Sequence, residues 1–165
     1  MKHFVTSLAL FALTSFASAQ TTGIPGLNDL RVNLMGSGTT SCNTIPWLGM
    51  GPVTAVFDVT CAPGTPVIFA FSASCTAPGI WLPPAPATCG GPLNGTPPSN
   101  IWWSLSLPVL LTVPAGAGAT GQARIAVPLP GPMPPGMSAA VQAILINSCA
   151  PMGFLLSQAH TFSWN

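Results

Sequence analysis

The sequence has very few ionisable side chains. It contains no Glu and no Tyr, and beyond residue 19 its only ionisable acids and bases apart from cysteines are Asp29, Arg31, Asp58, Arg124 and His160. General acid–base catalysis and most metal sites depend on clusters of such groups. Two arginines cannot form the basic surface that a nucleic-acid backbone or an anionic membrane surface requires. We therefore expect no nucleic-acid partner and no electrostatic binding to a membrane.

Residues 1–19 have the pattern of a secretory signal peptide. A basic start at Lys2 is followed by an apolar stretch from Phe4 to Phe16 and by the small-x-small cleavage pattern Ala17-Ser18-Ala19. This stretch is too short for a lasting anchor across a bilayer core of ~30 Å, and no later apolar run without breakers approaches ~20 residues. A buried N-terminal helix is the alternative. We expect cleavage near Ala19, no stable membrane insertion, and residues 20–165 as a single secreted or cell-surface domain.

Proline and glycine are abundant, with 20 and 17 residues, yet the chain is 48% hydrophobic and has a formal net charge of +1. Disordered chains usually combine low hydrophobicity with high net charge, which is the opposite composition. The Pro and Gly residues cluster between apolar runs, as they do where turns separate short strands. The composition therefore favours a folded all-β domain.

Two-residue alternation of side-chain character predicts most of the strands. The predicted strands are residues 30–34, 53–60, 67–71, 101–113, 122–127, 137–147 and 153–164. Pro108 cannot donate to a ladder, so the strand over 101–113 must lie on an edge, be bulged, or be broken in two. Residues 67–71 and 137–147 are apolar on both faces. A helix over Ser138–Ile146 is the rival interpretation, but its β-branched residues favour a strand.

These strands predict a single antiparallel β-sandwich of about seven to eight strands, immunoglobulin-like or jelly-roll-like. Two segments, 78–98 and 128–136, are too rich in proline for regular ladders, so we expect them to be loops. No linker or internal repeat divides the chain.

Five cysteines follow residue 19, and an exported chain is expected to form disulfides in an oxidising compartment. The odd number leaves one thiol over, and the sequence leaves the pairing open. Our first choice is Cys75–Cys89, which would close the Pro-rich segment between them. The second is Cys42–Cys61, with Cys149 as the unpaired thiol. No Cys-x-x-Cys pair occurs, so we expect no metal and no other cofactor.

Catalytic arrangements are few. His160 could form a triad with Asp29 or Asp58 and a serine only if the fold brings them together, and no Gly-x-Ser-x-Gly elbow occurs. The same two carboxylates are the only pair that could hydrolyse a glycoside. We expect Asp58 on the polar face of its strand, opposite Arg31 or Arg124. A histidine on a strand is more often structural. We therefore expect no enzymatic activity and keep a hydrolase around His160 as a remote alternative.

The five tryptophans give the strongest indication of a ligand. Trp103 shares a strand face with six aliphatic residues, so we expect it in the core. Trp102 is on the opposite face, and Trp81 lies in the Pro-rich segment. These two residues could stack on the rings of a neutral glycan, with local packing as the alternative.

The C-terminal third of the chain has a distinctive order of motifs. Gly121 is followed by Pro134-Pro135-Gly136, by Val141-Gln142-Ala143, and by a final strand that runs from Gly153 through Ser157-Gln158-Ala159. This order resembles that of short exported Pro/Gly-rich β-domain proteins of planctomycete-type bacteria, which often have Ser-Asn-Ala where Ser157-Gln158-Ala159 stands. The chain departs from that group in its extra Cys and Trp residues. The resemblance implies an extracellular β-domain and assigns no activity.

A net charge near zero favours self-association, and edge strands with apolar outer faces add to this tendency. The leading hypothesis is a non-catalytic secreted or cell-surface structural protein that self-associates or packs on an envelope component. The alternative is a secreted carbohydrate-binding module that uses Trp81 and Trp102.

Overall fold

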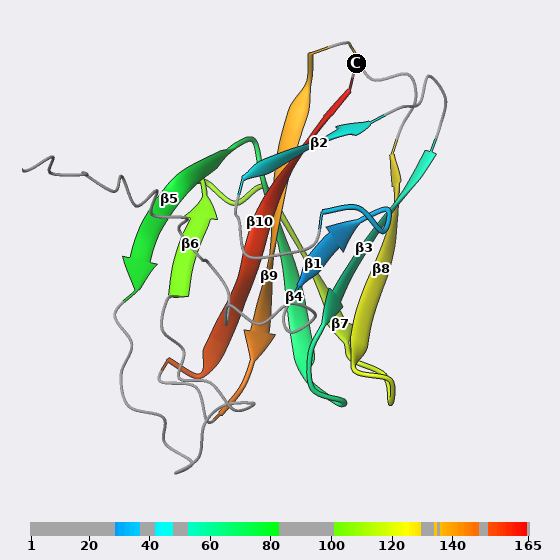
Figure 1. Cartoon of the computed structure of the whole chain (residues 1–165), viewed down its shortest axis with the longest axis vertical. Helices are drawn as coiled ribbons and strands as arrows, with labels where there is room; N and C mark the ends of the chain where they lie inside the picture. The colour runs from blue at the N-terminus through cyan, green and yellow to red at the C-terminus, as the bar shows by residue number, and fades with distance from the viewer. Residues whose placement is uncertain are drawn as a thin grey trace, which may run out of the picture.

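The computed structural model describes residues 29–36, 42–47, 53–82, 101–129, 134, 136–148 and 152–164. The predicted signal peptide lies outside these residues. The described part is all-β and contains no helix (Figure 1). Its ten strands are β1 (Leu30–Val32), β2 (Asn43–Trp47), β3 (Val53–Thr60), β4 (Pro66–Ser72), β5 (Cys75–Leu82), β6 (Ile101–Leu105), β7 (Leu111–Gly116), β8 (Gln122–Leu129), β9 (Ser138–Ile146) and β10 (Phe154–Trp164).

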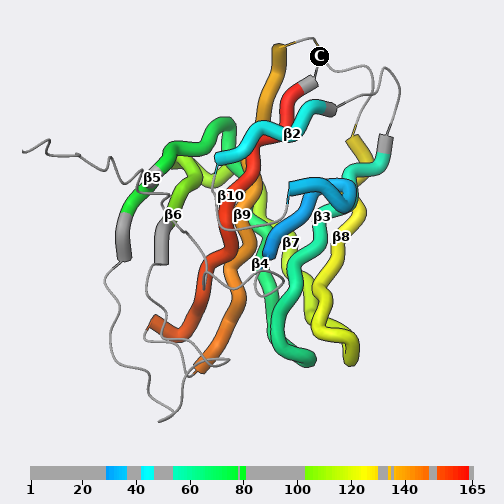
Figure 2. Tube along the Cα trace, in the orientation of Figure 1, coloured from blue at the N-terminus to red at the C-terminus, as the bar shows by residue number. Residues whose placement is uncertain are grey.

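The strands form three sheets. A three-stranded sheet has the order β1-β3-β8, a five-stranded sheet has the order β2-β10-β9-β4-β7, and β5 pairs with β6. Figure 2 shows β9 and β10 side by side along the middle of the molecule. Among these ten described strands, every ladder is antiparallel except that of β2 with β10. The prediction of an all-β fold is confirmed, but the strand number was too low and the fully antiparallel arrangement was wrong.

The three-stranded and five-stranded sheets pack on one shared core. Alternate residues of β3, namely Ala55, Phe57 and Val59, are fully buried in it, together with Phe69 of β4 and Val141 of β9. Phe57 makes an edge-on ring contact with Phe71 at a centroid distance of 5.0 Å. The two-residue period of β3 therefore separates a core face from an outer face.

The β5–β6 hairpin covers the opposite face of the five-stranded sheet. There Leu105 packs on Ala70, Ala140 and Ala159, and Trp103 lies against both this cluster and the main core. This second layer explains why β4 and β9 are apolar on both faces. Those faces are covered within the chain, so they are not the free association surfaces that the sequence suggested.

Prolines fall where a ladder tolerates them. Pro46, Pro114 and Pro128 lie in β2, β7 and β8, each of which is at the edge of its sheet, and Pro66 begins β4. An edge strand can lose an outward donor without losing a ladder bond. The predicted strand over 101–113 is broken in two around Pro108, which was one of the three expected outcomes.

Several predictions for individual segments were wrong. β2 was not predicted, because its five residues carry no alternating pattern. β5 extends over Pro78 to Leu82, where a loop was expected; the ladder accommodates this stretch through an irregularity between Cys75 and Ile80. Likewise β8 continues through Pro128 to Leu129. The strand over Ser138–Ile146 is confirmed against its helical rival.

Candidate functional site

The two tryptophans proposed as ligand contacts are neighbours in the structure. Trp81 of β5 and Trp102 of β6 are direct partners in the hairpin ladder. Their side chains lie outside the described residues. Trp103, which we expected in the core, is partly buried and packs against both hydrophobic clusters.

Three charged side chains lie next to one another on the outer face of the three-stranded sheet. The registers pair Arg31 of β1 with Asp58 of β3, and Asp58 with Arg124 of β8. Arg31 Nε donates to Asp58 Oδ1 at 2.9 Å, and its Nη2 donates to Oδ2 at 3.0 Å. Arg124 Nη2 also donates to Oδ2, at 3.2 Å. The expectation that Asp58 faces an arginine is confirmed, and its carboxylate is 1% exposed beneath both guanidinium groups.

A bulge in β10 carries a network of buried polar side chains. The register with β9 shifts between Leu156 and Ala159, so the ladder is interrupted at Ser157 and Gln158. Side chains replace the missing ladder bonds. Ala143 N donates to Ser157 Oγ at 2.9 Å, and Gln142 Nε2 donates to the Ser157 carbonyl at 2.9 Å. The backbone N–H and carbonyl groups that the bulge leaves without ladder partners are thus hydrogen-bonded by nearby side chains.

Two buried glutamines connect the central sheet to the layers on its two faces. Gln158 reaches β1: Leu30 N donates to its Oε1 at 3.1 Å, and its Nε2 donates to the Leu30 carbonyl at 3.2 Å. Gln142 reaches the hairpin on the other side, where Ser104 N donates to its Oε1 at 3.1 Å. A side-chain amide has one donor and one acceptor group, so Gln158 bonds Leu30 as the peptide of a neighbouring strand would.

His160 lies beside Gln158 and has no access to solvent. Its side chain is 0% exposed, and its Nε2 lies 2.9 Å from the Leu30 carbonyl. A carbonyl only accepts hydrogen bonds, so Nε2 carries the proton and Nδ1 is the unprotonated nitrogen of the neutral ring. Gly36, with φ of 79°, lies against the ring: a Cβ added there would be 3.0 Å from His160 Nε2.

Burial lowers the pKa of His160 below the usual value of 6.5, and this effect outweighs the backbone hydrogen bonds and the charge of Asp29, which act in the other direction. Nδ1 has no hydrogen-bond partner among the described residues. The Leu30 carbonyl bonds the ring, and Asp29 acts on it through its charge. The geometry is that of a neutral structural histidine.

Among the described cysteines, a disulfide joins Cys42 to Cys75, with a Cα–Cα distance of 5.5 Å. Both predicted pairings, Cys75–Cys89 and Cys42–Cys61, were wrong, because the fold brings the beginning of β2 beside the beginning of β5. Cys61 is instead a buried free thiol, and burial raises its pKa. Cys89 and Cys149 lie outside the described residues. Disulfides are typical of proteins that fold in an oxidising compartment.

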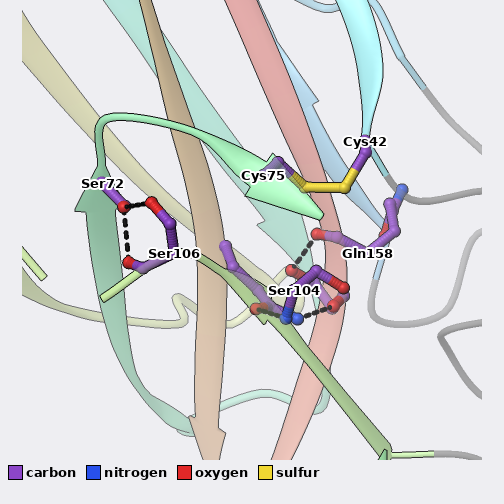
Figure 3. Close-up of a disulfide and its surroundings, with 8 residues drawn as sticks. Cys42, Ser72, Cys75, Ser104, Ser106 and Gln158 are labelled. Atoms are coloured by element: carbon purple, nitrogen blue, oxygen red, sulfur yellow. Dashed lines mark hydrogen bonds between the residues drawn. A yellow bond between two sulfur atoms is a disulfide. The ribbon is translucent and has the colours of Figure 1, made fainter. Parts of the chain in front are cut away.

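The disulfide fixes an edge strand to the hairpin layer. Cys42 N donates to the Ala159 carbonyl of β10 at 2.7 Å. The disulfide is therefore attached to the chain at the point where β2 starts to pair with β10. Figure 3 shows the sulfur–sulfur bond beside Gln158 and Ser104. Sequence reasoning missed the roles of Gln142 and Gln158. The signal that could have found them is a large polar residue inside an otherwise apolar strand, since such a group is buried only with partners.

A second polar contact holds the segment between β6 and β7. Ser72 at the end of β4 donates to the Ser106 carbonyl at 2.6 Å, and the two hydroxyl oxygens are also 2.6 Å apart (Figure 3). Ser106 N donates to the Ser74 carbonyl at 3.0 Å. Exposed leucines follow directly along the chain: Leu107, Leu110 and Leu111 are 73%, 66% and 49% exposed.

The described residues contain no group of three or more His, Cys, Asp or Glu side chains that could hold a metal ion. Across the same ranges there is no helix long and apolar enough to span a membrane. No protein-family model, curated protein or solved structure matches the chain. Its function must therefore be inferred from the chemistry of its own residues.

Proposed function

We propose that the protein is a non-catalytic exported β-domain that acts by surface contact, either by self-association or by packing on an envelope component. One observation carries this proposal: the few ionisable side chains serve the fold. Asp58 is enclosed by Arg31 and Arg124, while Asp29 and His160 are 3% and 0% exposed. Side chains buried in this way cannot exchange protons with a bound substrate, because a general acid or base must reach it.

Export is supported by two independent features. The first 19 residues have the composition of a signal peptide with cleavage near Ala19. The Cys42–Cys75 disulfide is consistent with folding outside the reducing cytosol. For the fold, we infer a β-sandwich made by the three-stranded and five-stranded sheets, in the manner of immunoglobulin-like or jelly-roll-like domains. The β5–β6 hairpin is an added layer on this sandwich.

Self-association is supported by the surface composition. Large apolar side chains are exposed at Leu34, Ile80, Leu107 and Leu110, each at 58% or more. Charged residues are only 3% of the chain, so little electrostatic repulsion keeps two copies apart. Contact between apolar surfaces removes area from water and is then favourable without any specific charge pairing.

Sedimentation velocity of the oxidised, processed chain tests the proposal. We expect the weight-average sedimentation coefficient to rise with concentration through the micromolar range, and to rise less when the protein is studied with a mild non-ionic detergent. A single monomeric species at several hundred micromolar would contradict self-association. Robust hydrolysis of an ester or glycoside panel that is lost in His160→Gln would contradict the non-catalytic assignment.

A secreted carbohydrate-binding module is the second candidate function. It is favoured by the ladder register, which places Trp81 directly opposite Trp102. Paired positions of a ladder share one face of the sheet, and aromatic residues at such positions are suited to stacking on the apolar faces of sugar rings. Tryptophan fluorescence should shift on addition of a soluble neutral glycan, and Trp81→Ala or Trp102→Ala should abolish the shift, whereas Trp47→Ala should retain it. An unchanged spectrum across a panel of neutral glycans would eliminate this candidate.

A further inference from the structure

We infer that Leu107, Leu110 and Leu111 form the surface through which one copy of the chain binds a second copy. These three residues are called the leucine edge. The inference rests on the proposed self-association and names the site where it occurs. It differs from the sequence-based expectation, which pointed to the outer faces of β4 and β9. The β5–β6 hairpin covers that face of β4 and β9 in the folded chain, while the leucine edge remains exposed.

The leucine edge lies at the open side of the five-stranded sheet. β7 is the last strand of that sheet and pairs with β4 on one side only, among the strands that the structure describes. Leu111 begins β7, and Leu107 and Leu110 belong to the segment that leads into it. In Figure 1, β7 meets β8 at the turn that joins them and diverges from it toward the Leu111 end. An unpaired edge strand with apolar side chains is a surface to which another strand or chain can bind.

The segment is held in place before any partner binds. Ser106 is bonded to Ser72 and to the Ser74 carbonyl, and Leu110 N donates to the Phe71 carbonyl at 2.8 Å. Between these attachments, Val109 packs against the second hydrophobic cluster. The backbone on both sides of the exposed leucines is therefore fixed to β4. A surface ordered in advance loses little conformational entropy on binding, which favours association.

A second copy is the occupant that the charge distribution favours. The sequence has no charged residue between Asp58 and Arg124, a stretch that includes all of β4 to β7. The leucine edge therefore offers no charge for a polar partner to complement and no basic residues for an anionic lipid surface. Monomeric proteins usually protect edge strands with charges or proline; β7 has no charge, and its proline, Pro114, lies three residues beyond Leu111. Two such edges related by a two-fold axis present the same uncharged apolar surface to each other.

The test compares two lysine substitutions at exposed positions at opposite ends of the sheet. Leu110→Lys places a charge in the leucine edge. Ile146→Lys is the matched control, because Ile146 is 41% exposed and is the last residue of β9. The preceding residue, Leu145, pairs with Val67 near the start of β4. Leu111, in contrast, pairs with Phe71 near the end of β4. Thermal unfolding of both variants should confirm that each is folded.

We expect the dimer dissociation constant from sedimentation to rise at least roughly tenfold in Leu110→Lys, as for a residue central to an interface. Ile146→Lys should dimerise like the unmodified protein. If the unmodified protein associates and Leu110→Lys associates equally well, the leucine edge is the wrong site while the proposed function stands. Equal loss in both variants would indicate non-specific apolar contact and would also overturn the inference. A monomeric unmodified protein would contradict both this inference and the proposed self-association.

Discussion

Protonation of His160 should make the protein less stable as the pH falls below neutrality. The folded-state pKa is lowered by burial, so the native chain binds fewer protons than the unfolded chain between its own pKa and the unfolded value of about 6.5. The free energy of unfolding must therefore rise with pH across this window and fall on acidification. In structural terms, protonation would place a positive charge on a ring with no access to solvent, and this cost outweighs the backbone hydrogen bonds and the charge of Asp29.

The size of the effect follows from the linkage relation. If the folded ring stays neutral throughout, acidification from about pH 7 to about pH 5.5 lowers the free energy of unfolding by about 1.3 kcal/mol, which is the upper limit of the effect. A folded pKa inside the window gives a smaller loss. The window isolates His160 because no other histidine follows residue 19 and carboxylates ordinarily titrate near 4. The change should be accompanied by a lower protection factor for the Leu30 amide, corrected for the slower intrinsic exchange at low pH, since His160 bonds the carbonyl of this residue.

Urea unfolding at the two pH values measures this, with His160→Gln as the matched comparison. Glutamine can still donate to the Leu30 carbonyl but does not titrate, so the variant should lose the pH dependence and keep most of the stability at pH 7. Equal acid destabilisation of both proteins would refute the reasoning, since the titrating group would then lie elsewhere. A stability that rises on acidification would refute it as well, because it would require a raised pKa.

Two further predictions concern the contacts that join the layers. Gln158→Ala leaves the buried Leu30 amide without its acceptor, which should cost about 1–3 kcal/mol of unfolding free energy in urea titrations. The exposed Gln122→Ala should change stability by no more than about 0.5 kcal/mol, and equal losses would contradict the assigned role. The disulfide closes a separation of 33 residues, so the Cys42→Ser/Cys75→Ser double variant should lose about 2–4 kcal/mol. Peptide mapping that finds Cys75 in any other pair would refute the assignment.

Most strands could be predicted because every second side chain of a strand faces the core, which leaves an alternating pattern of apolar residues in the sequence. β3 was predicted over its full length, since Ala55, Phe57 and Val59 face the core while Asp58 faces its two arginines. Residues 67–71, 122–127 and 137–147 were also recovered as strands. The two-residue period records burial on one face directly, whereas residues 67–71 and 137–147, which are covered on both faces, were recognised by their apolar and β-branched residues.

The parts that sequence reasoning missed depend on contacts between distant segments. β2 is a strand because β10 pairs with it, and β10 lies more than a hundred residues further along the chain. The Cys42–Cys75 bond depends on the same placement, so cysteine spacing could not have selected it. The hairpin layer was missed for a similar reason: Pro78 suggested a loop, but an irregular ladder with β6 tolerates it.

For the candidate site, the sequence predicted the scarcity of charge and the Asp58–arginine contact but not the polar network of β10. Ser157, Gln158 and Gln142 were noticed only as parts of a resemblance, and their function in the fold became clear from the bulge that they stabilise. A buried amide can be recognised in a sequence, but its partner cannot, because the Leu30 backbone that bonds Gln158 is 128 residues away.

The residues that hold the fold together and those available to a partner are therefore separate sets. Gln158, His160 and Asp58 are almost completely buried, whereas the side chains of the leucine edge are 49–73% exposed. Substitutions in the first set should change unfolding free energy and leave association unaltered per folded molecule. Substitutions in the second should change association and leave unfolding nearly unaltered. A catalytic domain would not show this separation, because its active-site groups are both partly buried and in contact with the substrate. Measuring both quantities on the same variants thus tests a role based on surface contact independently of any ligand.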